Sequence, residues 1–151
     1  MYQRILFAVD GSPSSELALA QALTLAKSAN GEVLALYVAD DSDVLFDVGY
    51  FDPKELKEAI LTIGRDALRA AGVRLTLEGV RHFTKLVDKP VARGAIAATI
   101  VREAEDWNAD VIVLGTHGRR GLRRLVMGSV AEGVLRISNK PVLLIRSEAE
   151  E

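Results

Sequence analysis

The sequence contains no cysteine, which excludes disulfide bonds, thiolate metal sites and a cysteine nucleophile. It also lacks the stretch of about 20 apolar residues that a membrane-spanning helix needs. The N-terminus shows no basic region followed by an apolar stretch and a cleavage site, so we expect no export signal. Together these absences favour a cytoplasmic protein that does not enter the bilayer.

Several motifs of nucleotide-dependent and hydrolytic enzymes are also missing. No glycine is followed by lysine, which excludes a P-loop of the Walker type, and no Gly-x-Gly-x-x-Gly follows the first apolar run. A Gly-x-Ser-x-Gly nucleophile elbow is absent, and the histidines His82 and His117 form no recognisable zinc spacing. The sequence therefore gives no support to kinase, dinucleotide-dependent or hydrolase chemistry.

The net charge is small, at −2 for a chain of 151 residues that is 49% hydrophobic and 26% charged. This composition is typical of one folded domain with a single hydrophobic core. So small a charge gives no long-range attraction to nucleic acid or to an anionic membrane, and we expect neither as a partner. We expect residues 1–147 to form the domain and residues 148–151 to be an acidic tail.

Short apolar runs alternate along the chain with segments of helical periodicity. The runs that predict strands buried on both faces are Ile5–Val9, Val33–Val38, Val111–Leu114 and Val142–Ile145. In the segment Val73–Val80 apolar residues alternate with polar ones, which predicts a further strand at an edge of the sheet.

Four amphipathic stripes predict the helices between these strands. Their apolar residues are Leu19, Ala22, Leu23 and Ala26; Leu56, Ile60, Ile63, Ala67 and Ala70; Ala92, Ile96, Thr99 and Ile100; and Val130, Val134 and Ile137. Ser12-Pro13 and Asp52-Pro53 have the form of helix starts, and Ser129 with Glu132 has capping-box spacing. The alternation implies a single-domain α/β fold, a doubly wound five-stranded parallel sheet with helices on both faces.

A glycine pattern follows the strand predicted at Val111–Leu114. Gly115-Thr116-His117-Gly118 is followed by nine residues and then by Gly128-Ser129, directly before a helix. Glycines let backbone N–H groups approach an anion closely, and a helix N-terminus adds unpaired N–H donors and a positive dipole end. The pattern therefore predicts a phosphate site, although taken singly the glycines have the form of turn residues and Ser129 that of a helix cap.

Several other features leave more than one role open. The segment 119–124 contains four arginines, which either clamp phosphate, with Arg119 the expected contact, or lie in solvent. His117 is a turn residue, a phosphate or metal neighbour, or a catalytic base. The acidic segment 39–52 is either a surface connection or a lid near the ligand. His82 and Trp107 are most simply packing residues.

The pattern Gly115-x-x-Gly118-x9-Gly128-Ser129 resembles the ATP-binding pattern of the universal stress protein family. The resemblance extends to Ile5–Ser12, Asn108–Leu114 and Asn139–Ile145, and it covers nearly the whole chain, with only the general layout matched between residues 40 and 90. It implies the strand order 3-2-1-4-5, with ATP lying across the ends of the first and fourth strands.

The resemblance also implies roles for individual residues. Asp10 is similar to the family aspartate near the ribose and the metal, which implies Mg²⁺ or Mn²⁺ as a second ligand; by position alone Asp10 has the form of a turn or cap residue. The residues implied to line the purine, the adenine edge and the nucleoside are Ala8, Val9, Val38, Leu114 and Gly115. Those implied around the phosphates are Thr116, His117, Gly118, Arg119, Gly128, Ser129 and Val130.

Three functions compete on this basis. The leading hypothesis is an ATP-binding regulatory module of the stress response, whose nucleotide occupancy changes its contacts with regulatory partners. A slow Mg-dependent ATPase would use Asp10 to hold the metal, but no base for the water is evident. A non-nucleotide interaction protein of the same fold is at odds with the intact glycine pattern. The resemblance further implies a homodimer that pairs through the last strand, Val142–Ile145.

Overall fold

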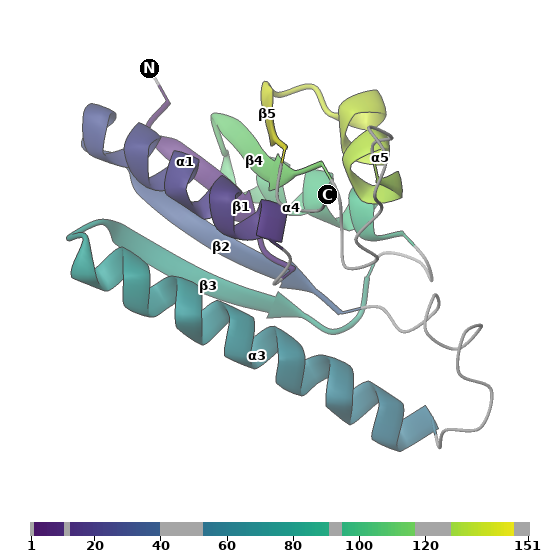
Figure 1. The fold of residues 1–151 in the computed structure, drawn as a ribbon. Helices are drawn as coiled ribbons and strands as arrows, with labels where there is room; N and C mark the ends of the chain where they lie inside the picture. Colours follow the sequence, from purple (N-terminus) through teal and green to yellow (C-terminus); the bar gives the residue numbers. More distant parts are fainter. Residues whose placement is uncertain (1, 11–12, 40–52, 91–94, 117–127, 147–151) are drawn as a thin grey trace.

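Five strands pair in parallel in one sheet (Figure 1). The computed structural model describes residues 2–10, 13–39, 53–90, 95–116 and 128–146. The strands are β1 (Arg4–Ala8), β2 (Glu32–Val38), β3 (Arg81–Val87), β4 (Val111–Gly115) and β5 (Val142–Ile145). Their order is β3-β2-β1-β4-β5, as predicted, and every pair is parallel. The winding direction therefore reverses between β1 and β4.

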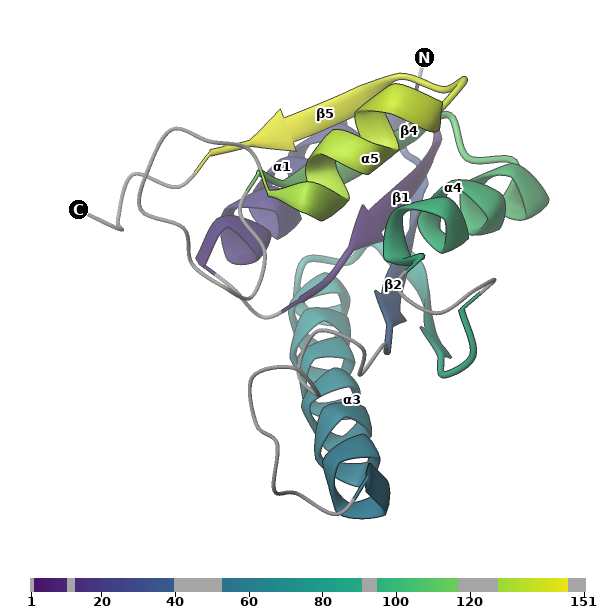
Figure 2. The same cartoon turned by 90° about the vertical axis from the view of Figure 1, so that its right-hand side faces the viewer.

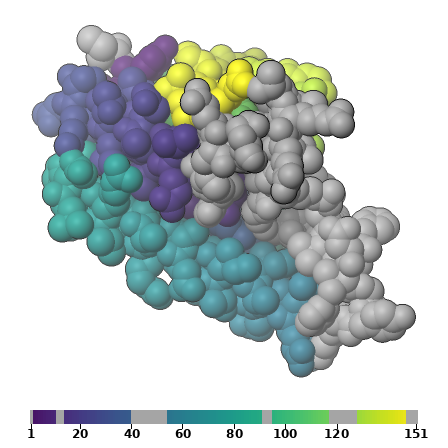
Figure 3. Space-filling view, in the orientation of Figure 1, coloured from purple at the N-terminus to yellow at the C-terminus, as the bar shows by residue number. Residues whose placement is uncertain are grey.

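Helices cover both faces of the sheet. They are α1 (Pro13–Ala29), α3 (Pro53–Leu77), α4 (Ile96–Trp107) and α5 (Ser129–Ile137). Figures 1 and 2 show α1 and α3 on one face and α4 and α5 on the other. In the space-filling view, α1 and α3 cover much of the face turned to the viewer (Figure 3). Among the described helices, none is long and apolar enough to span a bilayer.

Each face of the sheet has its own core because successive side chains of a strand point to opposite faces. Ile5 and Phe7 of β1 pack under α1 and α3, whereas Leu6 packs under α4 and α5. All three side chains are buried, with at most 1% exposure. This double burial explains why β1 reads as a continuous apolar run in the sequence.

The prediction of a strand at Val73–Val80 is wrong. Helix α3 continues through Leu77, and β3 follows it. Leu75 is fully buried, whereas Val73 and Leu77 are 55% and 81% exposed, so the apparent alternation is one core position of a helix flanked by two surface positions. The true third strand has no apolar run because it lies at the edge of the sheet and most of its residues are exposed or half-buried.

The helical stripes are confirmed for α1, where all four predicted residues are buried, and only in part elsewhere. In α3, Ile63 and Ala70 are exposed because the buried face runs through neighbouring positions such as Leu61 and Leu68. In α5, Ile137 is 43% exposed at the end of the helix. Helices α1 and α3 begin at their prolines, and the residues that precede them lie outside the described ranges.

Candidate functional site

The carboxyl ends of β1 and β4 meet where the winding direction reverses. The two strands are in register, with Ile5 opposite Val111 and Phe7 opposite Val113. Just beyond β1, the backbone N–H of Asp10 donates to the hydroxyl of Ser15, at 3.2 Å. Because Ser15 is a buried residue of the first turn of α1, this bond fixes the direction in which the chain leaves β1. Asp10 itself is half-buried, just beyond the carboxyl end of β1.

Gly115, the last residue of β4, lies against the first turn of α1. A Cβ atom on Gly115 would lie 2.2 Å from Oγ and 2.8 Å from Cβ of Ser14, which is itself 1% exposed. The glycine is therefore needed for the close approach of helix and strand, in addition to the turn or phosphate role suggested by the sequence. The pairing of Gly115 with Ser14 brings the α1 side of the site directly over the end of β4.

Thr116 joins β4 to both β5 and α5. Its N–H donates to the carbonyl of Ile145 at 3.0 Å, and its own carbonyl accepts from the N–H of Gly128 at 2.6 Å. The residue is 7% exposed. The hydrogen bond between Gly128 and Thr116 therefore holds the N-terminus of α5 beside the end of β4.

The first turn of α5 departs from the prediction. Gly128 is the N-cap, with an extended backbone (φ −66°, ψ 159°), and Ser129 is the first helical residue, so the capping box of Ser129 with Glu132 is wrong. The N-cap is Gly128, one residue before the predicted Ser129, because Gly128 has the extended backbone typical of an N-cap and Ser129 is already helical. The N–H of Gly128, one of the residues implied around the phosphates, donates to the carbonyl of Thr116.

The consequence is a helix N-terminus without a side-chain cap among the described residues. The first bond of the helix is donated by Glu132 to the carbonyl of Gly128, at 3.0 Å. The preceding N–H groups of the first turn have no acceptor within the helix itself. An N-terminus of this kind attracts an anion through its N–H donors and through the positive end of the helix dipole.

The remaining predicted residues lie around this edge in different settings. Val38 is the last residue of β2 and is buried. Two residues before it, the carbonyl of Leu36 accepts from the N–H of Val9 at 2.8 Å. The side chain of Leu114 is buried in the core under α4 and α5, and Val130 packs against the same core. His117, Gly118 and Arg119 lie outside the described residues.

Among the described residues, Asp10 supplies a carboxylate just beyond the end of β1. Over the ranges that the structure describes, no group of three His, Cys, Asp or Glu side chains is placed to hold a metal ion. Magnesium in nucleotide sites is usually held by one or two carboxylates together with phosphate oxygens and water. Asp10 fits such a site as a partner of bound phosphate and does not form a metal site by itself.

Ser14 and Ser15 are the site residues that sequence reasoning missed. Both are almost fully buried, at 1% and 3% exposure, and both contact the segments that were predicted to bind the ligand. Their position in the first turn of a helix after a strand was the available signal. It was overlooked because serine near a helix start is ordinarily explained by capping.

The model of the Universal stress protein family matches residues 1–146, which includes every segment of the site. The chain belongs to this family. Universal stress protein MJ0531 of Methanocaldococcus jannaschii is 33% identical over 151 residues, which are 100% of this chain and 86% of the relative. A family member from Burkholderia pseudomallei has a solved structure with 36% identity and a TM-score of 0.76 over 97% of each chain.

Two solved structures of the family contain adenine nucleotides. The Archaeoglobus fulgidus universal stress protein in complex with dAMP is 26% identical, with a TM-score of 0.65 over 95% of this chain and 98% of its own. A universal stress protein in complex with cAMP is 25% identical, with a TM-score of 0.64 over 97% and 98% of the two chains. Proteins similar to this chain in fold and sequence therefore bind nucleotides.

Proposed function

We propose that this chain binds ATP across the carboxyl ends of β1 and β4, with the phosphates at the N-terminus of α5. The observation that carries the proposal is the hydrogen bond from the Gly128 N–H to the Thr116 carbonyl, at 2.6 Å. This bond holds a helix N-terminus without a side-chain cap, among the described residues, at the end of a central strand. In open α/β sheets, ligands bind where the winding direction reverses.

Adenine recognition is supported by the complexes of similar proteins with dAMP and cAMP. The proposed contacts to the adenosine part are Ala8, Val9, Val38, Leu114 and Gly115. In this proposal the contacts of Leu114 and Val38 run through the backbone, because both side chains are buried in the core. Hydrogen bonding to the adenine edge by backbone groups needs no particular side chain.

The phosphates are assigned to the turn into α5 and to the segment that precedes it. The proposed contacts are Thr116, His117, Gly118, Arg119, Gly128, Ser129 and Val130. N–H groups of the first turn of α5 supply donors, and Asp10 holds Mg²⁺ or Mn²⁺ against the phosphate oxygens. A carboxylate beside phosphate is repulsive unless a cation lies between them, which is why the metal is part of the proposal.

We further propose a regulatory role in the stress response in the cytoplasm, in which nucleotide occupancy changes contacts with other proteins. Such a module needs binding contacts and no general base. The proposed assembly is a homodimer that pairs through β5, an apolar strand at the edge of the sheet. Two-fold pairing would satisfy its outer backbone groups without forming an open filament.

The direct test is to denature the freshly purified protein and identify the released nucleotide by chromatography. Recovered ATP supports a binding module, and recovered ADP favours slow hydrolysis. The protein stripped of nucleotide is then titrated with ATP in a calorimeter. Absence of released nucleotide together with no binding of added ATP would contradict the proposal.

A further inference from the structure

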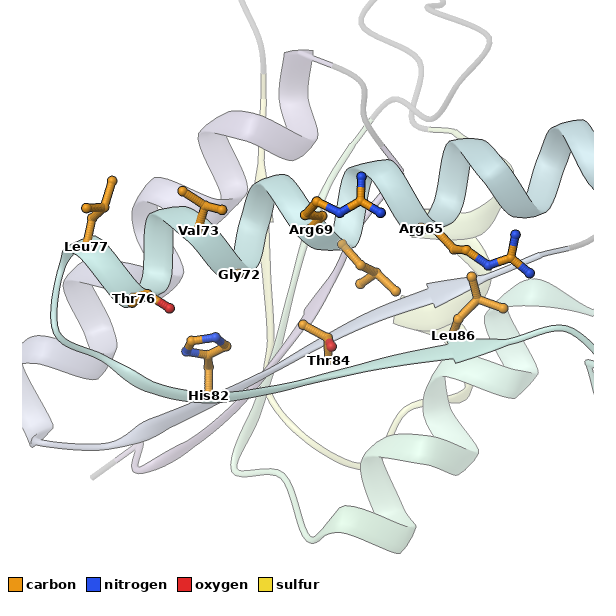
Figure 4. Close-up of a pocket in the computed structure, with 10 residues that line it drawn as sticks. Arg65, Arg69, Gly72, Val73, Thr76, Leu77, His82, Thr84 and Leu86 are labelled. Atoms are coloured by element: carbon orange, nitrogen blue, oxygen red, sulfur yellow. The ribbon is translucent and has the colours of Figure 1, made fainter.

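A groove lies between α3 and β3, at the edge of the sheet opposite β5. Its volume is about 670 Å³, within the range of about 300–1,000 Å³ that is usual for ligand pockets. Figure 4 shows His82, Thr84 and Leu86 standing on β3 toward the helix, with Thr76 and Arg65 reaching down from α3. Nothing in the proposed ATP site takes part in this groove, which lies on separate elements.

The floor of the groove is open because α3 carries a glycine there. A Cβ on Gly72 would lie 3.7 Å from Nε2 of His82 and 3.9 Å from Cγ2 of Thr84. His82 is fixed through its other ring nitrogen, Nδ1, which lies 2.9 Å from the carbonyl of Val80. The Nε2 atom of His82 consequently faces α3 in the groove.

The charged residues that line the groove are all basic. They are Arg65 and Arg69 of α3, and none of the lining residues carries a carboxylate. Arg69 makes an exposed ion pair with Asp66 at 3.2 Å, which is weak in water. Leu68 and Leu86 supply apolar surface between these groups. The lining therefore complements a ligand that carries acidic and apolar groups.

The outer edge of β3 borders the groove and exposes backbone groups. Among the described strands β3 pairs with β2 alone, and the carbonyl of Val87 points to β2, where it accepts from Ala39 at 2.8 Å. Because backbone groups of alternate residues point to the same side of a strand, those of Thr84 and Leu86 point outward. A strand that added here would find both hydrogen-bonding groups and the groove.

The opposite face of β3 also has an apolar residue to cover. Phe83 points away from α3 and is 50% exposed. A small molecule in the groove would leave Phe83 and the outer backbone groups uncovered, whereas an added strand covers the backbone and both faces. A second copy of this chain pairing through its own β3 is disfavoured, because that strand carries no acidic side chain that could meet Arg65 and Arg69.

We propose that an extended segment of another protein, carrying acidic and apolar residues, adds to the outer edge of β3 as a sixth strand. Its backbone pairs with Thr84 and Leu86, its acidic side chains meet Arg65 and Arg69, and its apolar side chains pack on Leu68 and Leu86. This mode of recognition takes affinity from main-chain bonds and specificity from pockets for alternate side chains. It is independent of the ATP site.

The probe is a library of displayed random peptides, selected on the full chain, with the enriched sequence then synthesised and its affinity measured. We expect enrichment of peptides that combine Asp or Glu with apolar residues. The double variant Arg65→Glu/Arg69→Glu should lose at least about tenfold in affinity. The matched control is Arg102→Glu, a charge reversal on the exposed surface of α4, which should bind as the wild type does. The thermal unfolding of each variant checks that the fold is retained.

Amide hydrogen exchange by NMR distinguishes strand addition from docking elsewhere. In the free protein the outward amides of Thr84 and Leu86 should exchange faster than those of Phe83 and Lys85, which face β2. The bound peptide should slow exchange at Thr84 and Leu86. Selection that yields no acidic peptide, equal binding by the double variant, or unchanged exchange at these two amides would overturn the proposal.

Discussion

Gly115 lies where β4 passes the first turn of α1, and Ser14 occupies the space that a side chain would fill. Gly128 has an ordinary extended backbone and serves as the N-cap of α5. Neither residue has a positive φ in this structure, since the positive-φ glycine among the described residues is Gly79. Of the motif glycines among the described residues, Gly115 therefore allows α1 to approach β4 closely and Gly128 begins α5, and neither is needed for an unusual backbone angle.

Gly115→Ala should lower the free energy of unfolding by about 1–3 kcal/mol, as overpacking in a tight site does. The added Cβ would meet Oγ, Cβ and the backbone carbonyl carbon of Ser14, the last at 2.9 Å. Adding Ser14→Gly removes the first two contacts and should recover part of the loss. Urea unfolding of the single and double variants measures both effects, and an unchanged midpoint for Gly115→Ala would show that α1 moves freely.

Asp10→Ala should weaken binding of Mg·ATP more than binding of metal-free ATP, because the carboxylate helps chiefly by holding the cation. Calorimetric titrations with and without Mg²⁺ make the comparison. Asp106→Ala, which removes an exposed carboxylate on α4, is the control and should change neither affinity. Equal losses under the two conditions would mean that Asp10 acts on the ribose or on the turn after β1.

At the scale of elements, α3 approaches the sheet through its glycines. Gly64 lies over Tyr37, and Gly72 lies over His82 and Thr84. A Cβ on Gly64 would lie 2.5 Å from Cδ1 of Tyr37, whose side chain is fully buried, whereas a Cβ on Gly72 would make ordinary van der Waals contact. A side chain added at Gly64 would therefore clash, whereas one added two turns later at Gly72 would fit.

Gly64→Ala should destabilise the protein by about 1–3 kcal/mol, because the buried ring has no room to move away. Gly72→Ala should stabilise it by about 0.5–1 kcal/mol, since alanine is the better helix former and no close contact opposes it. Chemical unfolding of the two variants side by side tests the assignment. The reverse ranking would show that α3 packs on the sheet in another register.

The sequence predicts the strands that form continuous apolar runs, including the half-buried edge strand β5, and misses the edge strand β3, which has no such run. β1, β2 and β4 were found because double burial leaves continuous apolar runs. β3 was missed because an edge strand under one helix retains polar residues such as Arg81 and Lys85. In α3, Ile63 was wrongly assigned to the buried face, because it is an apolar residue at an exposed position of the helix.

For the candidate site, the sequence predicted which segments meet at the end of β4, but not the hydrogen bonds that join them. The glycine spacing points to the end of β4 and the start of α5, but pairing of Gly128 with Thr116 depends on how the chain returns to the sheet. Which residue caps α5 depends on backbone angles that capping-box spacing does not determine. The contact of Gly115 with Ser14 depends on the approach of α1 to β4, which is a property of the packed fold.

At the scale of the whole molecule, the two edges of the sheet have different chemistry. β3 carries Arg81 and Lys85, and the groove beside it contains Arg65 and Arg69, whereas β5 has the apolar sequence Val-Leu-Leu-Ile. The carbonyls of Pro141 and Ile145 accept from β4, so the backbone groups of the residues between, Val142 and Leu144, point outward. An apolar edge suits pairing with a second copy, and a basic edge suits an acidic partner.

The homodimer predicted through β5 should appear in analytical ultracentrifugation as a species of twice the chain's mass at micromolar concentration. Leu144→Pro removes an outward N–H of this edge and should yield a monomer. Thr84→Pro makes the same change at the β3 edge and should leave the dimer intact. A wild-type monomer whose mass does not change on adding ATP would count decisively against pairing through β5.

The ATP site at the end of β4 is tested most directly by the thermal unfolding of Gly128→Val with and without ATP. Wild type should gain about 2.7 kcal/mol at an ATP concentration of 100 Kd, and Gly72→Ala, on the far side of the sheet, should gain the same. In Gly128→Val a branched side chain stands at the N-cap, before the donors of α5. The extended backbone of this residue tolerates valine, although valine is the poorer cap. The variant should therefore unfold cooperatively at a somewhat lower temperature that ATP does not change. A variant that retained the wild-type gain would show that phosphate is held elsewhere than at the start of α5.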